Sequence, residues 1–204
     1  SGTSRLPPNR PALLVVGKHD GVGFPDASSA SVALRVSAAS ACPVLAVPGG
    51  RPAGAGPVIA AVDLDEPCDD VLDFAFTEAG RRDAALEVIH VREEPRNLKR
   101  PHRAERLGQA VVPAEHELRL RLDEVLHSAR RRHPGIDPAG RIDTGSAAGV
   151  LVEASRSAGL MVVGARRRSA GKGHRQRIGP VAHSLLQHAE CPVAVVPLDA
   201  APQQ

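Results

Sequence analysis

The stretch Leu160-Met161-Val162-Val163-Gly164 and the stretch Cys191-Pro192-Val193-Ala194-Val195-Val196-Pro197 frame a pattern that the chain carries twice. The other copy runs from Leu13-Leu14-Val15-Val16-Gly17 to Cys42-Pro43-Val44-Leu45-Ala46-Val47-Pro48. Gly17 and Cys42 are 25 positions apart, and Gly164 and Cys191 are 27 apart, so the copies are divergent but in register. Each copy is typical of a strand, a loop, a helix and a second strand. Internal repetition is stronger evidence of architecture than local propensity.

The two copies differ in what precedes them. A polar, proline-rich stretch (residues 1–12) precedes the first copy, whereas a long series of strand and helix patterns precedes the second. We therefore predict that the chain divides into the C-terminal half of a first unit (1–50), a glycine- and proline-rich linker (51–56), a complete domain (57–198) and a tail (199–204).

The complete domain shows alternating strand and helix patterns. Val58–Val62 is a short apolar run, as expected of a strand that is buried on both faces. The remaining strands are predicted at about 86–91, 139–143, 160–163 and 193–196, and the helices at about 68–82, 114–132, 147–158 and 180–189, with an irregular connection over 92–112. This alternation predicts a three-layer α/β domain with a mostly parallel five-stranded sheet, plus a β-α-β remnant of the preceding copy. In such sheets ligands bind beyond the carboxyl ends of the strands.

Composition limits the function classes. The chain is 42% hydrophobic and 24% charged, and no apolar run approaches the roughly 20 residues of a membrane helix, which predicts a soluble, cytoplasmic protein without a membrane partner. Three cysteines without a CxxC pair indicate neither a disulfide framework nor a zinc site. The net charge of +3 is concentrated in arginine runs, and Trp and Tyr are absent, which argues against a nucleic-acid surface.

The order of short motifs resembles the universal stress protein family. The first strand of the complete domain ends in Val62-Asp63, the second in His90-Val91, a Gly145-Ser146 turn follows the third, and the Val-Val-Gly and Cys-Pro-Val segments complete the match. The resemblance implies a Rossmann-like fold of the adenine-nucleotide alpha-hydrolase type, in a tandem arrangement whose first copy is truncated. It also implies that Asp63 and Val91 would lie beside adenine and ribose.

Nucleotide-binding members of that family carry Gly-x2-Gly-x9-Gly-Ser/Thr after the fourth strand, and this chain departs from it. Gly164 and Gly179 are present, but Arg167 replaces the second glycine, the loop is longer, and Pro180 replaces the hydroxyl residue. Proline has neither an N–H nor a hydroxyl to offer a phosphate. The loop instead carries cationic side chains that can bind phosphate in another geometry: Arg166, Arg167, Arg168, Lys172, Arg175 and Arg177.

These observations leave two main functional hypotheses and a weaker third. In the first, the protein acts by association and ligand sensing rather than turnover, with a degraded ATP-binding loop; the strands Val44–Val47 and Val193–Val196 pair within the chain or between chains. In the second, ATP binds because arginines replace the missing groups, with slow hydrolysis at most. A weaker third reading is nucleic-acid contact through the arginine loop and Arg130–Arg132. The candidate ligand-binding residues are Asp63, Val91, Gly164, Arg166, Gly179 and Val181; no catalytic residue and no metal ligand is expected.

Overall fold

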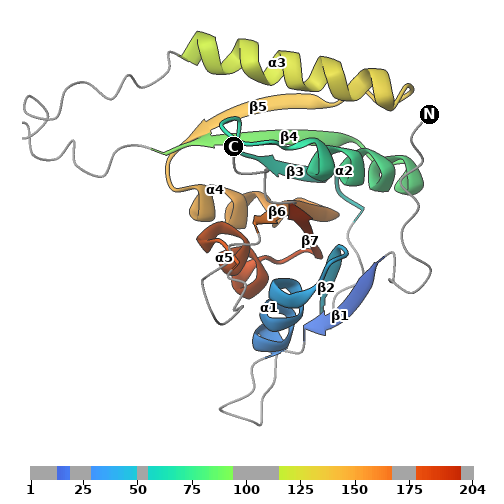
Figure 1. The fold of residues 1–204 in the computed structure, drawn as a ribbon, viewed down its shortest axis with the longest axis vertical. Helices are drawn as coiled ribbons and strands as arrows, with labels where there is room; N and C mark the ends of the chain where they lie inside the picture. Colours follow the sequence, from blue (N-terminus) through green and yellow to red (C-terminus); the bar gives the residue numbers. More distant parts are fainter. Residues whose placement is uncertain (1–12, 19–28, 50–54, 94–114, 167–177, 199–204) are drawn as a thin grey trace, which may run out of the picture.

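The computed structural model describes residues 13–18, 29–49, 55–93, 115–166 and 178–198. Within these ranges seven strands form one sheet in the order β1-β2-β7-β6-β3-β4-β5, and Figure 1 shows this sheet running from β5 at the top to β1 at the bottom. The strands are β1 (Leu14–Lys18), β2 (Val44–Pro48), β3 (Val58–Val62), β4 (Leu86–Arg92), β5 (Ala139–Thr144), β6 (Leu160–Arg166) and β7 (Val193–Leu198). The helices are α1 (Ser29–Ala39), α2 (Asp69–Arg82), α3 (Glu115–Arg132), α4 (Ala147–Ala154) and α5 (Pro180–His188).

The complete domain contains the predicted five parallel strands. β3 pairs with both β4 and β6, β4 pairs with β5, and β6 pairs with β7, all in parallel. The chain therefore moves outward from β3 to β5 and then crosses to β6 on the other side. This reversal of direction places the switch point of the sheet between β3 and β6, where ligands bind in folds of this kind.

The first unit joins the same sheet. β1 and β2 pair in parallel, and β2 pairs with β7 in the antiparallel direction, with Val44 opposite Val195 and Ala46 opposite Val193. The seven strands thus form a single sheet across both copies of the repeat.

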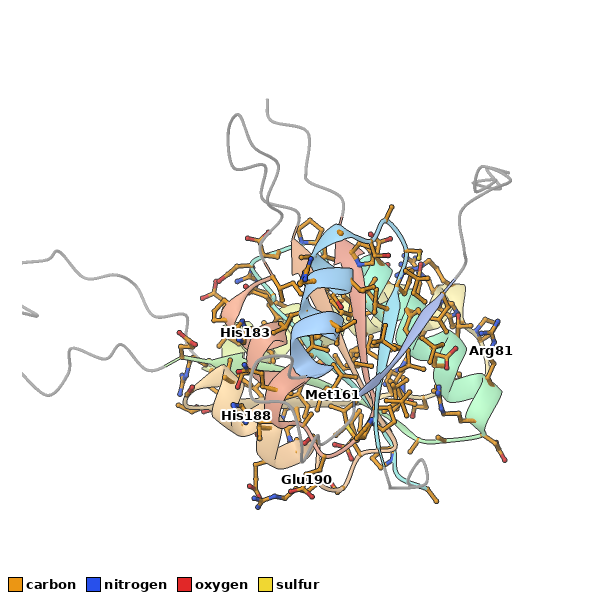
Figure 2. The ribbon with its side chains drawn as sticks, turned by 90° about the horizontal axis from the view of Figure 1, so that it is seen from below. Arg81, Met161, His183, His188 and Glu190 are labelled. Atoms are coloured by element: carbon orange, nitrogen blue, oxygen red, sulfur yellow. The ribbon has the colours of Figure 1, made fainter. Side chains whose placement is uncertain are left out.

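Helices cover the two faces of the sheet in separate layers. One apolar core joins α2 and α3 to the sheet through side chains such as Phe76 and Leu122, and a second joins α1, α4 and α5 through side chains such as Ile89 and Leu185. Figure 2 shows Arg81 of α2 at one side of the molecule and His183 of α5 at the other. Met161 of β6 lies between them and is fully buried.

Three details of the prediction require correction. The helix predicted over 147–158 ends at Ala154, and the N–H groups of Arg156 and Ser157 donate to carbonyl oxygens only three residues back, those of Glu153 (3.2 Å) and Ala154 (3.3 Å). β6 and β7 extend beyond their predicted ends, to Arg166 and Leu198. The buried residues of α3 are Leu118, Leu122, Leu126 and Ala129, although the sequence pattern also allows a stripe that includes Val125, which is only partly buried.

Two of the predicted segments fall largely or wholly outside the described residues. Most of the irregular connection at 92–112 and the basic loop residues 167–177 lie outside them. Gly56, at the end of the predicted linker, lies against the backbone of 157–159, and a Cβ at this position would lie 2.1 Å from the Ser157 carbonyl oxygen. Among the described helices, none has the length and apolar character that crossing a bilayer requires.

Candidate functional site

A pocket of about 550 Å³ lies at the carboxyl ends of β3, β4 and β6, at the switch point of the sheet. The first turns of α4 and α5 and the N-terminal parts of α2 and α3 complete its walls. Its volume falls in the range typical of small-molecule sites. The lining residues are Ala61, Val62, Asp63, Asp65, Glu66, Pro67, Cys68, Val71, Ile89, His90, Val91, Arg92, Glu93, Leu118, Ala147, Leu151, Val163, Gly164, Val181 and Leu198.

Four of the predicted binding residues meet at this pocket. Asp63 follows β3, Val91 lies near the end of β4, Gly164 belongs to β6, and Val181 is in the first turn of α5. Gly179 is the exposed N-cap residue of α5 and is not part of the described lining. Arg166 ends β6, and its side chain lies outside the described part of the chain.

The loop after β3 is held by hydrogen bonds within itself. The Asp63 carboxylate accepts from the backbone N–H of Asp65 (3.1 Å), and the Asp63 carbonyl oxygen accepts from the N–H of Glu66 (3.1 Å). An aspartate that bonds the backbone two residues ahead forms a local turn. One oxygen of the Asp63 carboxylate is therefore used in shaping the loop that forms this wall of the pocket.

Two side chains from other elements fix the same loop, and the sequence analysis did not identify either of them. His90 Nδ1 lies 3.2 Å from the Val62 carbonyl oxygen and 3.4 Å from the Leu64 backbone nitrogen, which ties β4 to the end of β3. Arg121 of α3 donates to the Leu64 carbonyl oxygen (2.7 Å) and to Asp65 Oδ1 (3.0 Å). His90 was at least visible as the neighbour of Val91 in the strand motif, whereas no sequence pattern pointed to Arg121.

Gly164 is explained by packing inside the pocket wall. A Cβ at this position would lie 2.7 Å from Leu198 Cδ1 and 3.2 Å from Val71 Cγ2. The absence of a side chain lets Leu198, at the end of β7, fold against β6. In the described structure, Gly164 therefore serves to admit an apolar side chain.

Most of the pocket wall is apolar, but its charged residues are predominantly acidic. The described lining contains four carboxylates and one arginine, Arg92, which donates to Thr144 Oγ1 (3.2 Å). The carboxylates are those of Asp63, Asp65, Glu66 and Glu93. Asp65 among them forms an ion pair with Arg121 (3.0 Å), and Asp63, Asp65 and Glu93 are exposed to solvent.

The Cys68 thiol lies in the pocket wall at the N-cap of α2 and is 8% exposed. Burial, and next the nearby charge of Asp69, raise its pKa to about 11. A thiol attacks as its thiolate, so Cys68 is a poor nucleophile near neutral pH. In the described part of the chain, no three His, Cys, Asp or Glu side chains are grouped so that they could hold a metal ion.

The N-terminus of α5 lies at Pro180, where the helix predicted at about 180–189 begins. Pro180 is the first residue of the helix, Gly179 precedes it in extended conformation, and no side chain caps the helix. Proline is favoured there because the N–H it lacks has no partner inside the helix. The same feature removes one backbone donor from the end of the helix that anions approach.

Comparisons with known proteins place this geometry in context. The family described as "Universal stress protein family" matches residues 55–197. One similar solved structure is a Pseudomonas aeruginosa PAO1 protein of unknown function, which covers 92% of this chain at 21% identity and a TM-score of 0.59. Another is a universal stress protein from Archaeoglobus fulgidus DSM 4304, which covers 91% of this chain at 18% identity and a TM-score of 0.59. The chain spans 63% and 62% of their lengths. A second universal stress protein from Archaeoglobus fulgidus covers 69% of this chain and 98% of its own length, at 20% identity and a TM-score of 0.51. At these identities the likeness shows a shared fold. Comparison with curated protein sequences gave no match.

Proposed function

Because this chain belongs to the universal stress protein family, we propose that its complete domain is a sensor that binds an adenine nucleotide or nucleoside and acts by association rather than turnover. The observation that carries the proposal is the meeting of Asp63, Val91, Gly164 and Val181 at one pocket. These residues come from three strands and a helix, at the switch point where open α/β sheets bind ligands.

The apolar part of the pocket suits a planar base. Val62, Ile89 and Val163 line it together with Leu151 and Val181, and apolar walls with a few placed polar groups are typical of cofactor sites. Asp63 supplies the acceptor, since its second carboxylate oxygen is available for an amino or hydroxyl group of a ligand while Oδ1 holds the loop. His90 and Arg121 keep that loop in place and act as positioning residues.

The phosphate end of the site supports a degraded loop. Pro180 removes an amide donor, and the charged residues of the described lining are predominantly acidic. The alternative, in which Arg166 and the arginines beyond it restore phosphate affinity, differs in one measurable respect. In the degraded-loop proposal affinity does not rise from adenosine to ATP, whereas in the alternative it rises with each phosphate.

Calorimetric titration tests both forms of the proposal. Adenosine, AMP and Mg·ATP are titrated into the protein, with guanosine as the specificity control. We expect adenosine and AMP to bind, and Asp63→Ala to weaken them about tenfold, as loss of one hydrogen bond to a charged group predicts. Asp137→Asn, at an exposed residue paired with Arg130, is the matched carboxylate control and leaves binding unchanged. No heat with any adenine compound at millimolar concentration would refute the proposal.

Association is proposed to use the last strands of the two copies. The antiparallel pairing of β2 with β7 supports this, because it covers an edge of the complete domain's sheet that otherwise invites aggregation. Deletion of residues 1–50 uncovers the edge of β7, and we expect the shortened protein to dimerise through Val193–Val196 or to lose solubility. A monodisperse monomer in sedimentation analysis would contradict this part of the proposal.

A further inference from the structure

His90 is a polar side chain inside the wall of the pocket. It lies opposite Val62 in the ladder between β3 and β4. Its side chain is on the same face of the sheet as that of Val88, because successive side chains of a strand alternate between faces, and α2 and α3 cover this face. The residue is only 8% exposed, yet it lines the pocket together with Cys68 and Leu118.

The two nitrogen atoms of the His90 ring differ in their surroundings. Nδ1 lies beside the loop after β3, whereas Nε2 has no hydrogen-bond partner among the described residues. Nε2 is also not enclosed in the core, since in the described part of the chain the only fully enclosed side-chain nitrogen or oxygen without a partner is Ser37 Oγ. Because the rest of the ring is buried and the residue lines the pocket, Nε2 opens onto the pocket.

The contacts of Nδ1 decide which ring nitrogen carries the proton. A neutral imidazole has one N–H, so one of its nitrogens donates and the other accepts. Nδ1 lies 3.2 Å from the Val62 carbonyl oxygen, which can only accept, and 3.4 Å from the Leu64 backbone nitrogen, which can only donate. The nearer contact falls within the usual N–H···O range of about 2.7–3.2 Å, and two lone pairs facing each other at that distance would repel. This geometry favours a proton on Nδ1 and leaves the lone pair of Nε2 directed at the pocket.

We propose that His90 Nε2 accepts a hydrogen bond from the ligand, so that one imidazole ring joins the bound molecule to the loop after β3. The inference rests on the proposed function and narrows it to ligands with at least two N–H or O–H donors, one for Nε2 and one for Asp63. An adenine nucleoside carries such donors in its 6-amino group and its ribose hydroxyls. A ligand donor on Nε2 also strengthens the bond from Nδ1 to the Val62 carbonyl oxygen, because hydrogen bonds in a chain polarise one another.

Hydrogen-bond acceptors outnumber charged donors in the described pocket lining. The four carboxylates accept when they are ionised, and the guanidinium of Arg92 donates to Thr144 Oγ1 (3.2 Å). His90 Nε2 adds an uncharged acceptor that belongs to a largely buried ring. A ligand without a matching donor would leave this lone pair unpaired, and a polar site rejects analogues in this way.

The first test titrates adenosine and three analogues that each lack one donor, namely inosine, 2′-deoxyadenosine and 3′-deoxyadenosine, into the parent protein and His90→Asn. Asparagine keeps an amide near the position of Nδ1, which can hold the loop, but has no atom at the position of Nε2. We expect His90→Asn to weaken adenosine about tenfold, as the loss of one hydrogen bond predicts. One analogue should lose the same factor with the parent and nothing further with His90→Asn, because both changes then remove the same hydrogen bond. His127→Asn, at an exposed position of α3, is the matched control and leaves adenosine binding unchanged.

The second test needs no ligand. Long-range proton–nitrogen NMR spectra locate the ring proton, with the His90 signals identified by their loss in His90→Asn, and we expect it on Nδ1 at alkaline pH, where histidine side chains are ordinarily neutral. A proton on Nε2 overturns the inference. Adenosine binding that His90→Asn leaves unchanged, or weakens equally for every analogue, also overturns it, and the proposed function survives either result. No heat with any adenine compound instead refutes the proposed function, and this inference falls with it.

Discussion

The Cys68 thiol couples the stability of the protein to alkaline pH. Its pKa is raised from the ordinary 9.0 to about 11, first by burial and then by Asp69, so the unfolded chain releases this proton at lower pH than the folded one. Between pH 9 and 11 the folded state binds more protons, and the free energy of unfolding therefore falls as pH rises. Each pKa unit corresponds to about 1.4 kcal/mol, so the loss is about 2 kcal/mol at pH 11 and approaches about 3 kcal/mol only above it.

Urea denaturation at pH 8, 9, 10 and 11 measures this effect. The parent protein and Cys68→Ala are compared, because alanine keeps the site apolar and has no proton to release. We expect the difference in unfolding free energy between the two proteins to shift by about 2–3 kcal/mol in favour of the variant across this range. Leu120→Ala, at an exposed position, should follow the parent curve. Parallel curves for the parent and Cys68→Ala would refute the argument and would indicate a thiol that ionises normally.

Three further predictions concern packing and are checked by thermal or urea unfolding. Gly56→Ala should destabilise by about 3 kcal/mol or prevent folding, because its Cβ would meet the backbone of Ser157 rather than a movable side chain; an unchanged midpoint would contradict the close approach. Phe76→Ala should cost about 3–5 kcal/mol, since the ring is fully buried and stacks on His133 at 5.0 Å; a loss below about 1 kcal/mol would count against it. Leu120→Ser should change stability by less than about 0.5 kcal/mol because the side chain is exposed; a large loss would show an unrecognised contact.

The positions of the strands could be predicted because most of them carry their own signal, whereas their order in the sheet is known only from the structure. Val58–Val62 and Val193–Val196 are apolar and rich in β-branched residues, as buried parallel strands require, and the repeated Cys-Pro-Val segment located the second strand of each copy. The approximate position of the pocket followed from topology, since the carboxyl ends of β3, β4 and β6 meet at one edge. Asp63, Val91 and Gly164 were named from the resemblance to the universal stress protein family, and all three line this pocket.

The remaining features depend on contacts between distant parts of the chain. Arg121 reaches a carbonyl oxygen 57 positions away, and no local pattern distinguishes it from the other arginines of α3. The buried Ser155 hydroxyl accepts from the backbone N–H of Glu190, 35 positions away, and no local pattern indicates this contact. Gly164 was assigned to phosphate binding by motif, whereas its need for a missing side chain becomes visible only when Leu198 folds against it.

The antiparallel joint between β2 and β7 sets the direction in which each copy of the repeat faces. Since the two strands run opposite ways, the carboxyl ends of β1 and β2 point away from the rim that holds the pocket of the complete domain. A cavity completed on the first copy would therefore open on the far rim of the sheet. Two molecules bound at these opposite rims could not touch, so any influence of one on the other would pass through the ladder between Val44–Ala46 and Val193–Val195 and through the apolar core that α1 shares with α5.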